Sequence, residues 1–91
     1  MKKIHSLTPY IVSGKLRMII INYLNISPKT PSWIAKDSSK SIQSVSRVLK
    51  GLLEKKLVER HLSNAKIKAK FYSLTEEGEK LAKNLEELGY F

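Results

Sequence analysis

The sequence predicts a mainly α-helical domain with one small β-hairpin, an α+β fold, and three observations support this. Apolar residues recur at helical spacing over residues 14–24, 41–55 and 76–88. Residues 67–74, IKAKFYSL, alternate in polarity and are rich in the aromatic and β-branched types that favour strands. The chain has 91 residues, of which 42% are hydrophobic and none is cysteine, so it can bury one modest core and has no disulfide framework.

The first regular helix is expected to begin after Ser13. Its apolar residues share one broad face, formed by Leu16, Ile19, Ile20, Tyr23 and Leu24. Before it, Thr8-Pro9 suits the start of a single helical turn, because proline is favoured at the first helical position. Residues 1–12 are therefore interpreted as an N-terminal arm. The two prolines of NISPKTP, residues 25–31, end the helix.

A tight turn is expected between the second and third helices. Thr30 is a good N-cap for a short helix, SWIAK, and the polar run DSSKS, residues 37–41, follows as the turn. Ser41 then caps a helix that runs to about Lys55. Gly51 lies inside this helix and costs about 1 kcal/mol relative to alanine. The inward stripe of this third helix consists of Val45, Val48, Leu49 and Leu52.

The hairpin and a final helix complete the chain. LVERHL, residues 57–62, is the first strand, and SNAK, residues 63–66, is the turn before the second strand. Thr75 caps the last helix, and the three glutamates in its first turn complement the positive end of the helix dipole. Gly89 ends it. The order is helix, helix, turn, helix, hairpin, helix.

Charge points to a polyanionic partner. Seventeen Lys/Arg face eight Asp/Glu, a net charge of +9. Residues 1–75 carry fifteen basic and three acidic residues (+12), whereas residues 76–91 carry two basic and five acidic ones (−3). This distribution favours nucleic acid over an anionic membrane surface, and over a charge that serves solubility alone.

Two helices joined by a tight turn and followed by a basic hairpin predict a winged helix-turn-helix, whose second helix enters the DNA major groove. In the helix over 41–55, Gln43, Ser44 and Arg47 are the candidates for base readout. An ordinary solvated helix face is the alternative. Such a face usually mixes charges, yet Glu54 is the only acid between Asp37 and Glu59.

The expected contacts to the DNA backbone come from three places. Lysines at every second position of the second strand point to one side, although they can also protect a sheet edge. The start of the second helix offers hydroxyl groups and free N–H groups to phosphate. The full set is Thr30, Ser32, Lys36, Lys40, Ser41, Ser46, Lys50, Lys66, Lys68 and Lys70.

These segments resemble a known family. TPSWIAKDSSKSIQSVSRVLKGLLEKKLVER, residues 30–60, resembles the helix-turn-helix of winged-helix transcriptional regulators of the MarR/ArsR type, and FYSLTEEGEKL, residues 71–81, resembles the strand and helix that close their wing. The resemblance covers about residues 14–88 and is greatest to minimal archaeal and archaeal-virus forms. It implies a homodimer that binds double-stranded DNA and represses or activates transcription.

Three positions depart from this pattern. Lys56 stands where the family usually has a glycine, so the exit from the third helix is expected to differ. Lys40 occupies a turn position that is commonly apolar, and Ile42 is expected to take over its packing. Trp33 replaces a polar residue. It is expected to pack half-buried between the first two helices, with a partner or a phosphate contact as the alternative.

The last helix is expected to mediate dimerisation, because little of its own domain is left for it to cover. Residues 13–75 would form the DNA-binding domain and residues 76–91 the dimerisation helix. Packing on the chain's own core is the alternative. The residues assigned to the contact are Leu81, Leu85 and Leu88, joined by Leu7 and Ile11 of the arm.

Other functions find little support in the sequence. No nucleophile–base spacing or Gly-rich phosphate loop is present, so an enzyme is not expected. With His5 and His61 as the only histidines, no metal site or other cofactor is expected, and 91 residues leave little room for an effector pocket. The longest apolar run, Met18–Ile21, cannot span a bilayer, and no signal-peptide h-region follows the N-terminus, so a cytoplasmic location is expected. An architectural DNA-binding protein, or a module for RNA or protein assembly, remains the alternative function.

Overall fold

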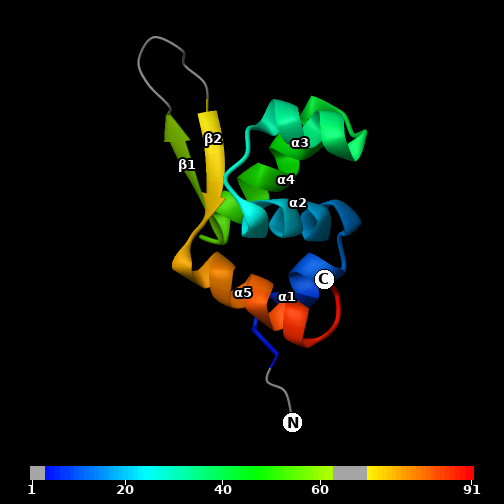
Figure 1. Cartoon of the computed structure of the whole chain (residues 1–91), viewed down its shortest axis with the longest axis vertical. Helices are drawn as coiled ribbons and strands as arrows, with labels where there is room; N and C mark the ends of the chain where they lie inside the picture. The colour runs from blue at the N-terminus through cyan, green and yellow to red at the C-terminus, as the bar shows by residue number, and fades with distance from the viewer. Residues whose placement is uncertain (1–3, 63–69) are drawn as a thin grey trace.

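The structure, a computed structural model, describes residues 4–62 and 70–91. Within them it contains, in order, α1 (Thr8–Val12), α2 (Lys15–Ile26), α3 (Pro31–Ser38), α4 (Ile42–Glu54), β1 (Val58–Leu62), β2 (Lys70–Leu74) and α5 (Glu76–Glu87) (Figure 1). The predicted mainly α-helical fold with one hairpin is confirmed. The expected turn over residues 63–66, the start of the second strand, and Lys66 and Lys68 lie outside the described residues.

Three helices begin at the N-caps that the sequence predicts. Thr30 accepts a hydrogen bond from Trp33 N through its side chain at 3.1 Å, as the N-cap of α3. Ser41 caps α4 and Thr75 caps α5 in the same way. Helix α1 differs, because the residue at its N-cap is Leu7, which makes no side-chain cap. These hydroxyl groups satisfy N–H groups that a helix start leaves unpaired.

Three helices also end in one common motif. A residue in the left-handed conformation follows each of them: Ser39 after α3 (φ 57°), Lys56 after α4 (φ 60°) and Gly89 after α5 (φ 85°). At each exit the next N–H bonds to a carbonyl five residues back, as Leu57 N does to Leu52 O at 3.0 Å. This is the Schellman motif. The expectation that lysine at position 56 would change the exit from α4 is therefore wrong: Lys56 adopts the left-handed conformation that glycine usually takes there.

The core lies around α2, which contacts α1, α4, α5 and β2 and lies in the middle of the molecule (Figure 1). Because α2 has neighbours on several sides, its buried face is wider than predicted and includes Ile21 as well as Ile20 and Leu24. In the described part of the chain, the hydrophobic residues with no exposed surface are Ile11, Ile20, Ile21, Ile34, Val45, Leu52, Leu57, Leu81, Ala82 and Leu85. No helix of the described segments has the length and apolar character that crossing a membrane requires.

The hairpin is joined to the helical part by one short bridge. Strands β1 and β2 are antiparallel, with Val58 opposite Leu74 and Arg60 opposite Tyr72. Lys29, between α2 and α3, pairs with Tyr72 through two main-chain hydrogen bonds of 3.0 and 2.8 Å. No local pattern in the sequence indicates this bridge. It fixes the hairpin against the start of α3.

Two glycines lie at close contacts, and only Gly78 faces a main-chain atom. A Cβ atom on Gly78 would overlap the carbonyl oxygen of Leu57, at the point where α5 begins beside the end of α4. A Cβ on Gly51 would lie 2.8 Å from the Tyr10 hydroxyl, which packs on α4 at that position. The absence of a side chain at Gly51 thus leaves room for the Tyr10 hydroxyl beside α4, at a position where glycine lowers helix propensity.

Candidate nucleic-acid interface

Helix α4 has one buried and one exposed side, as the sequence predicts. Val45, Leu49 and Leu52 are buried in the core. The opposite side exposes a polar series formed by Ser41, Gln43, Ser46, Arg47 and Lys50. The buried stripe thus fixes the helix to the domain, while its short polar side chains and cations face outward.

The exposed groups of α4 are available to a ligand. Gln43, Arg47 and Lys50 make no hydrogen bond or ion pair with any other residue in the described ranges. Ser44 is different, because it is half-buried and belongs to the N-cap: its N–H donates to Ser41 Oγ at 3.1 Å, and Ser41 Oγ donates to Ser44 Oγ at 2.9 Å. The amide and guanidinium groups are the kinds that make bidentate contacts to adenine and guanine.

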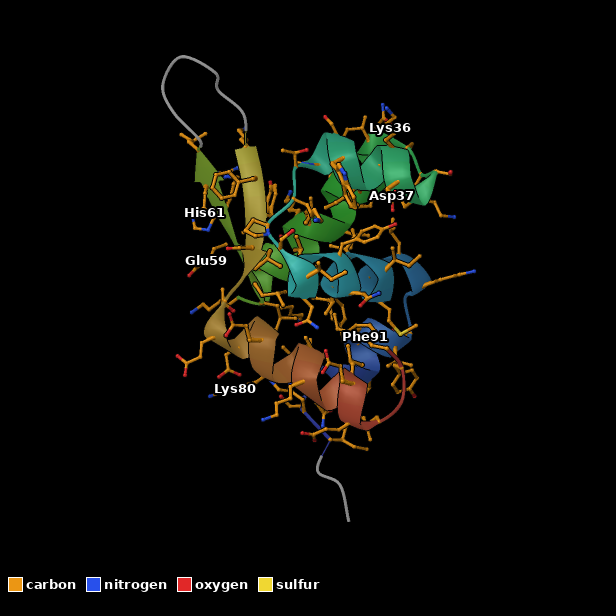
Figure 2. All side chains as sticks on the ribbon, in the orientation of Figure 1. Lys36, Asp37, Glu59, His61, Lys80 and Phe91 are labelled. Atoms are coloured by element: carbon orange, nitrogen blue, oxygen red, sulfur yellow. The ribbon has the colours of Figure 1, made fainter. Side chains whose placement is uncertain are left out.

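The start of α3 presents part of the predicted backbone contacts. Ser32, Lys36 and Lys40 are exposed, and the Thr30 hydroxyl is occupied as the N-cap. Figure 2 shows Lys36 and Asp37 on the outer surface of α3. Ile42 is 41% exposed, so the expectation that it replaces Lys40 in the packing of the turn is wrong. The turn after α3 is instead held by a main-chain hydrogen bond, which Lys40 N donates to Ala35 O.

Trp33 packs on α2, as expected from the sequence. Its ring meets the Tyr23 ring edge-on with centroids 5.0 Å apart, and the side chain stays 41% exposed. The Lys29 ammonium lies over the Trp33 ring, 4.6 Å from its centroid, and donates to Ser27 Oγ at 2.6 Å. A hydrogen bond with Asp37, together with burial, raises the pKa of Tyr23 above its ordinary value. The contact between the Tyr23 and Trp33 rings joins α2 to the start of α3.

One side of the hairpin carries cations beside this region. Lys70 is exposed and lies on the same side of β2 as Tyr72, whereas Lys66 and Lys68 lie outside the described residues. Arg60 is exposed opposite Tyr72 and extends the basic side. Arg60 and Lys29 were missed by sequence reasoning, because only the strand register and the bridge to Tyr72 bring them here.

The other side of the hairpin resembles a catalytic arrangement but lacks its geometry. The His61 and Phe71 rings stack with centroids 5.0 Å apart, and His61 Nε2 is 2.8 Å from Ser73 Oγ. Glu59 Oε2 approaches the same nitrogen at 3.7 Å. Figure 2 shows Glu59 and His61 on the outer side of the hairpin. A relay needs the acid on the second ring nitrogen, so this cluster is not a hydrolytic triad.

The assignment of three dimer residues has to be corrected. Leu81, Leu85 and Ile11 have no exposed surface, because they pack into the chain's own core against α2. A side chain without exposed surface adds nothing to a contact with a second copy of this fold. Leu7 and Leu88 are only partly buried and remain candidates.

The N-terminal segment is held on α5 through polar groups. Asn84 Oδ1 accepts from His5 N at 3.0 Å and from Thr8 Oγ1 at 2.8 Å. His5 Nδ1 accepts from Leu7 N, so the neutral ring carries its proton on Nε2, which faces Glu77 Oε2 at 3.2 Å. Within residues 4–62 and 70–91, no group of three or more His, Asp or Glu side chains can hold a metal ion.

A helix pair joined by a tight turn, a polar second helix and a hairpin with a basic side together define a winged helix-turn-helix domain of the type found in transcriptional regulators. Residues 11–91 match the family described as HxlR-like helix-turn-helix, and the chain belongs to this family. The family consists of regulators, not enzymes. No curated protein matches the sequence.

Solved structures of regulators share the fold. The reduced transcriptional regulator YodB of B. subtilis is 25% identical, with a TM-score of 0.78 over 87% of this chain and 78% of that one. A variant of S. aureus MepR bound to an oligodeoxyribonucleotide is 28% identical, with a TM-score of 0.70 over 75% of this chain and 51% of its own. A variant of Lactococcus lactis ZitR is 24% identical, with a TM-score of 0.76 over 81% of this chain. The chain spans only 51% of the length of that ZitR chain.

Proposed function

We propose that the protein is a sequence-specific regulator of transcription that binds double-stranded DNA. In this proposal α4, the expected recognition helix over residues 41–55, enters the major groove, and the hairpin around residues 62–71 contacts the backbone or the minor groove. The observation that carries it is the exposed side of α4, where Gln43 and Arg47 lie unpaired above a fully buried apolar stripe. The family and the DNA-bound state of the MepR variant support the proposal.

Base readout rests on Gln43 and Arg47, with Ser44 limited by its role in the cap. Backbone contacts rest on exposed groups that flank α4 on both sides. These are Ser32, Lys36, Lys40, Ser41, Ser46, Lys50 and Lys70, with Arg60 added by the structure. Phosphate contacts of this kind position a protein on the duplex without reading its sequence.

The proposed regulator acts as a homodimer, and a repressor is the form we favour. Its dimer contact is proposed on the apolar surface at the end of α5 near α1, where the C-terminus lies (Figure 1). The residues there with exposed apolar surface are Ile4, Leu7, Leu88, Tyr90 and Phe91. To bind two half-sites one helical turn apart, such a dimer would have to hold its two copies of α4 about 34–36 Å apart, and its site would be pseudo-palindromic.

Selection of bound duplexes from a random-sequence pool, at about 150 mM salt, tests the proposal. An enriched inverted repeat with half-sites one helical turn apart is the expected result. Binding without any enriched motif would replace it with an architectural role. No binding to duplex DNA would overturn DNA regulation and favour assembly with RNA or protein.

A further inference from the structure

We propose that a groove between the end of α2, the end of β2 and the start of α5 docks a peptide segment of another protein, in which a large aliphatic side chain lies beside lysine or arginine. The groove is a hollow of about 560 Å³. Its lining comes from Leu24, Asn25, Ile26, Pro28, Ser73, Leu74 and Glu79. Figure 1 shows the end of α2 between β2 and the first turn of α5.

Part of the groove is apolar and includes one unusually exposed aliphatic side chain. Leu24 is almost completely buried at its floor, and Leu74 is half-buried beside it. Ile26, the last residue of α2, is 73% exposed, the largest exposed fraction of any large apolar side chain in the described part of the chain. Pro28 is also exposed next to it. An aliphatic side chain that entered here would remove apolar surface from water on both partners.

The charge at the rim specifies the second half of the partner's chemistry. Glu79 is exposed, and its carboxylate has no hydrogen bond or ion pair to the rest of the described chain. The nearby Lys80 is turned to Glu77, with its Nζ 3.3 Å from Oε1, and the ammonium of Lys29 is held by Ser27 and the Trp33 ring. The Glu79 carboxylate is thus left without a compensating cation, although the whole chain has a net charge of +9.

A second carboxylate lies close to the same hollow. Glu86 Oε1 accepts a hydrogen bond from Asn25 Nδ2 at 2.7 Å, and Asn25 lines the groove. Glutamates in the first turn of α5 also complement the helix dipole, which accounts for acid at that place. The dipole does not account for the exposed Ile26 beside it. A hollow of mixed lining, with the exposed Ile26 side chain and the Glu79 carboxylate at its rim, is complementary to a segment that is both aliphatic and cationic.

The groove does not compete with the proposed DNA contacts. Helix α4 contributes no lining residue, and Figure 1 shows α4 behind α2. The acidic rim repels phosphate, so nucleic acid is a poor occupant. A partner can therefore occupy the groove while α4 lies on DNA, and the docking does not depend on DNA binding.

Fluorescence anisotropy with two labelled peptides tests the proposal on the full chain. The probe is Gly-Lys-Lys-Ile-Leu-Lys-Lys-Gly, and the control replaces Ile-Leu by Ser-Ser at equal charge. We expect the probe to bind at least about fivefold more tightly than the control. Ile26→Ser and Glu79→Gln should each weaken probe binding by about fivefold or more, while Glu54→Gln on α4 should leave it unchanged.

Both groove side chains are exposed, so their replacement leaves the core intact, and a thermal unfolding curve verifies each variant. Equal binding of the two peptides, or probe binding that survives both groove substitutions, would overturn the proposal. No binding of the probe at about 1 mM would overturn it as well. DNA binding by the same variants is measured separately, which keeps this outcome distinct from failure of the proposed function.

Discussion

Thr8 and Asn84 are joined across the whole chain by a hydrogen bond of 2.8 Å between the threonine hydroxyl and the asparagine side-chain carbonyl. Thr8 is only 4% exposed, the one buried polar residue in the described ranges. The same carbonyl accepts from His5 N. One α5 side chain therefore secures the start of α1 and the segment before it.

Replacement of this acceptor should destabilise the fold. Asn84→Ala leaves the buried Thr8 hydroxyl and the His5 N–H without their partner, and we expect a loss of about 2 kcal/mol in the free energy of unfolding. Urea denaturation measures it. Asn22→Ala on the exposed side of α2 is the matched control, expected within about 0.5 kcal/mol of the unmodified protein. Equal stability of the two variants would show that the bond contributes nothing.

Arg47 should determine sequence preference. Arg47→Ala is expected to weaken binding to the selected site by about 1–3 kcal/mol and to relax preference at one base pair, because a bidentate contact is removed. Titration of the selected duplex and of its single-base variants measures this. Lys83→Ala on α5 should leave both quantities unchanged. Unaltered affinity of Arg47→Ala would mean that α4 does not read the bases.

Lys70 should act without regard to sequence. Lys70→Ala removes one cation from the basic side of the hairpin, so all duplexes should bind more weakly to a similar extent. The slope of the logarithm of affinity against the logarithm of salt concentration should fall by about one. Binding measured at several salt concentrations, on selected and random duplexes, gives both numbers. A loss confined to the selected duplex would contradict a phosphate role.

The exit of α4 offers a stabilising substitution. Lys56 adopts a left-handed conformation that costs a residue with a Cβ atom more than it costs glycine. We expect Lys56→Gly to raise the free energy of unfolding by about 1 kcal/mol. Lys50→Gly, inside the same helix, should lower it by about 1 kcal/mol. Denaturation curves that move in the same direction for both would refute the explanation.

Glu77 should make a pH-dependent contribution to stability. Its hydrogen bond with His5, aided by Lys80, lowers the pKa of Glu77 below its ordinary value of 4.5. Its contribution is therefore fully present above about pH 4.5 and is lost as the pH falls through the lower folded value. The stability difference between the unmodified protein and Glu77→Gln should shrink on acidification. Glu76→Gln, whose nearest cation is 3.9 Å away, is the control.

Local signals in the sequence were sufficient for the elements. The caps at Thr30, Ser41 and Thr75 depend on residues three positions apart, and the apolar stripe of α4 repeats within one helix. The bridge between Lys29 and Tyr72 joins residues far apart in the sequence and has no local signal. Arg60 could be placed on the basic side of the hairpin only once the pairing register of β1 and β2 was known.

The dimer residues illustrate a different limit. The leucine stripe on α5 predicts that one side of the helix is buried. It does not indicate whether the same chain or a second copy covers that side. Leu81 and Leu85 are covered by the protein's own core, since α2 and α1 both reach that side. In the same way, sequence alone could not show that Gly51 makes room for Tyr10.

The main-chain bridge between Lys29 and Tyr72 has a mechanical consequence. It ties the middle of β2 to the connection before α3, so that the hairpin is held at a fixed position beside the helix-turn-helix. A protein that holds these two elements at a fixed spacing cannot adjust to a DNA groove that is too wide or too narrow. In the proposed complex, a duplex that does not match this spacing would have to deform, and the cost of that deformation would depend on base steps that no side chain touches.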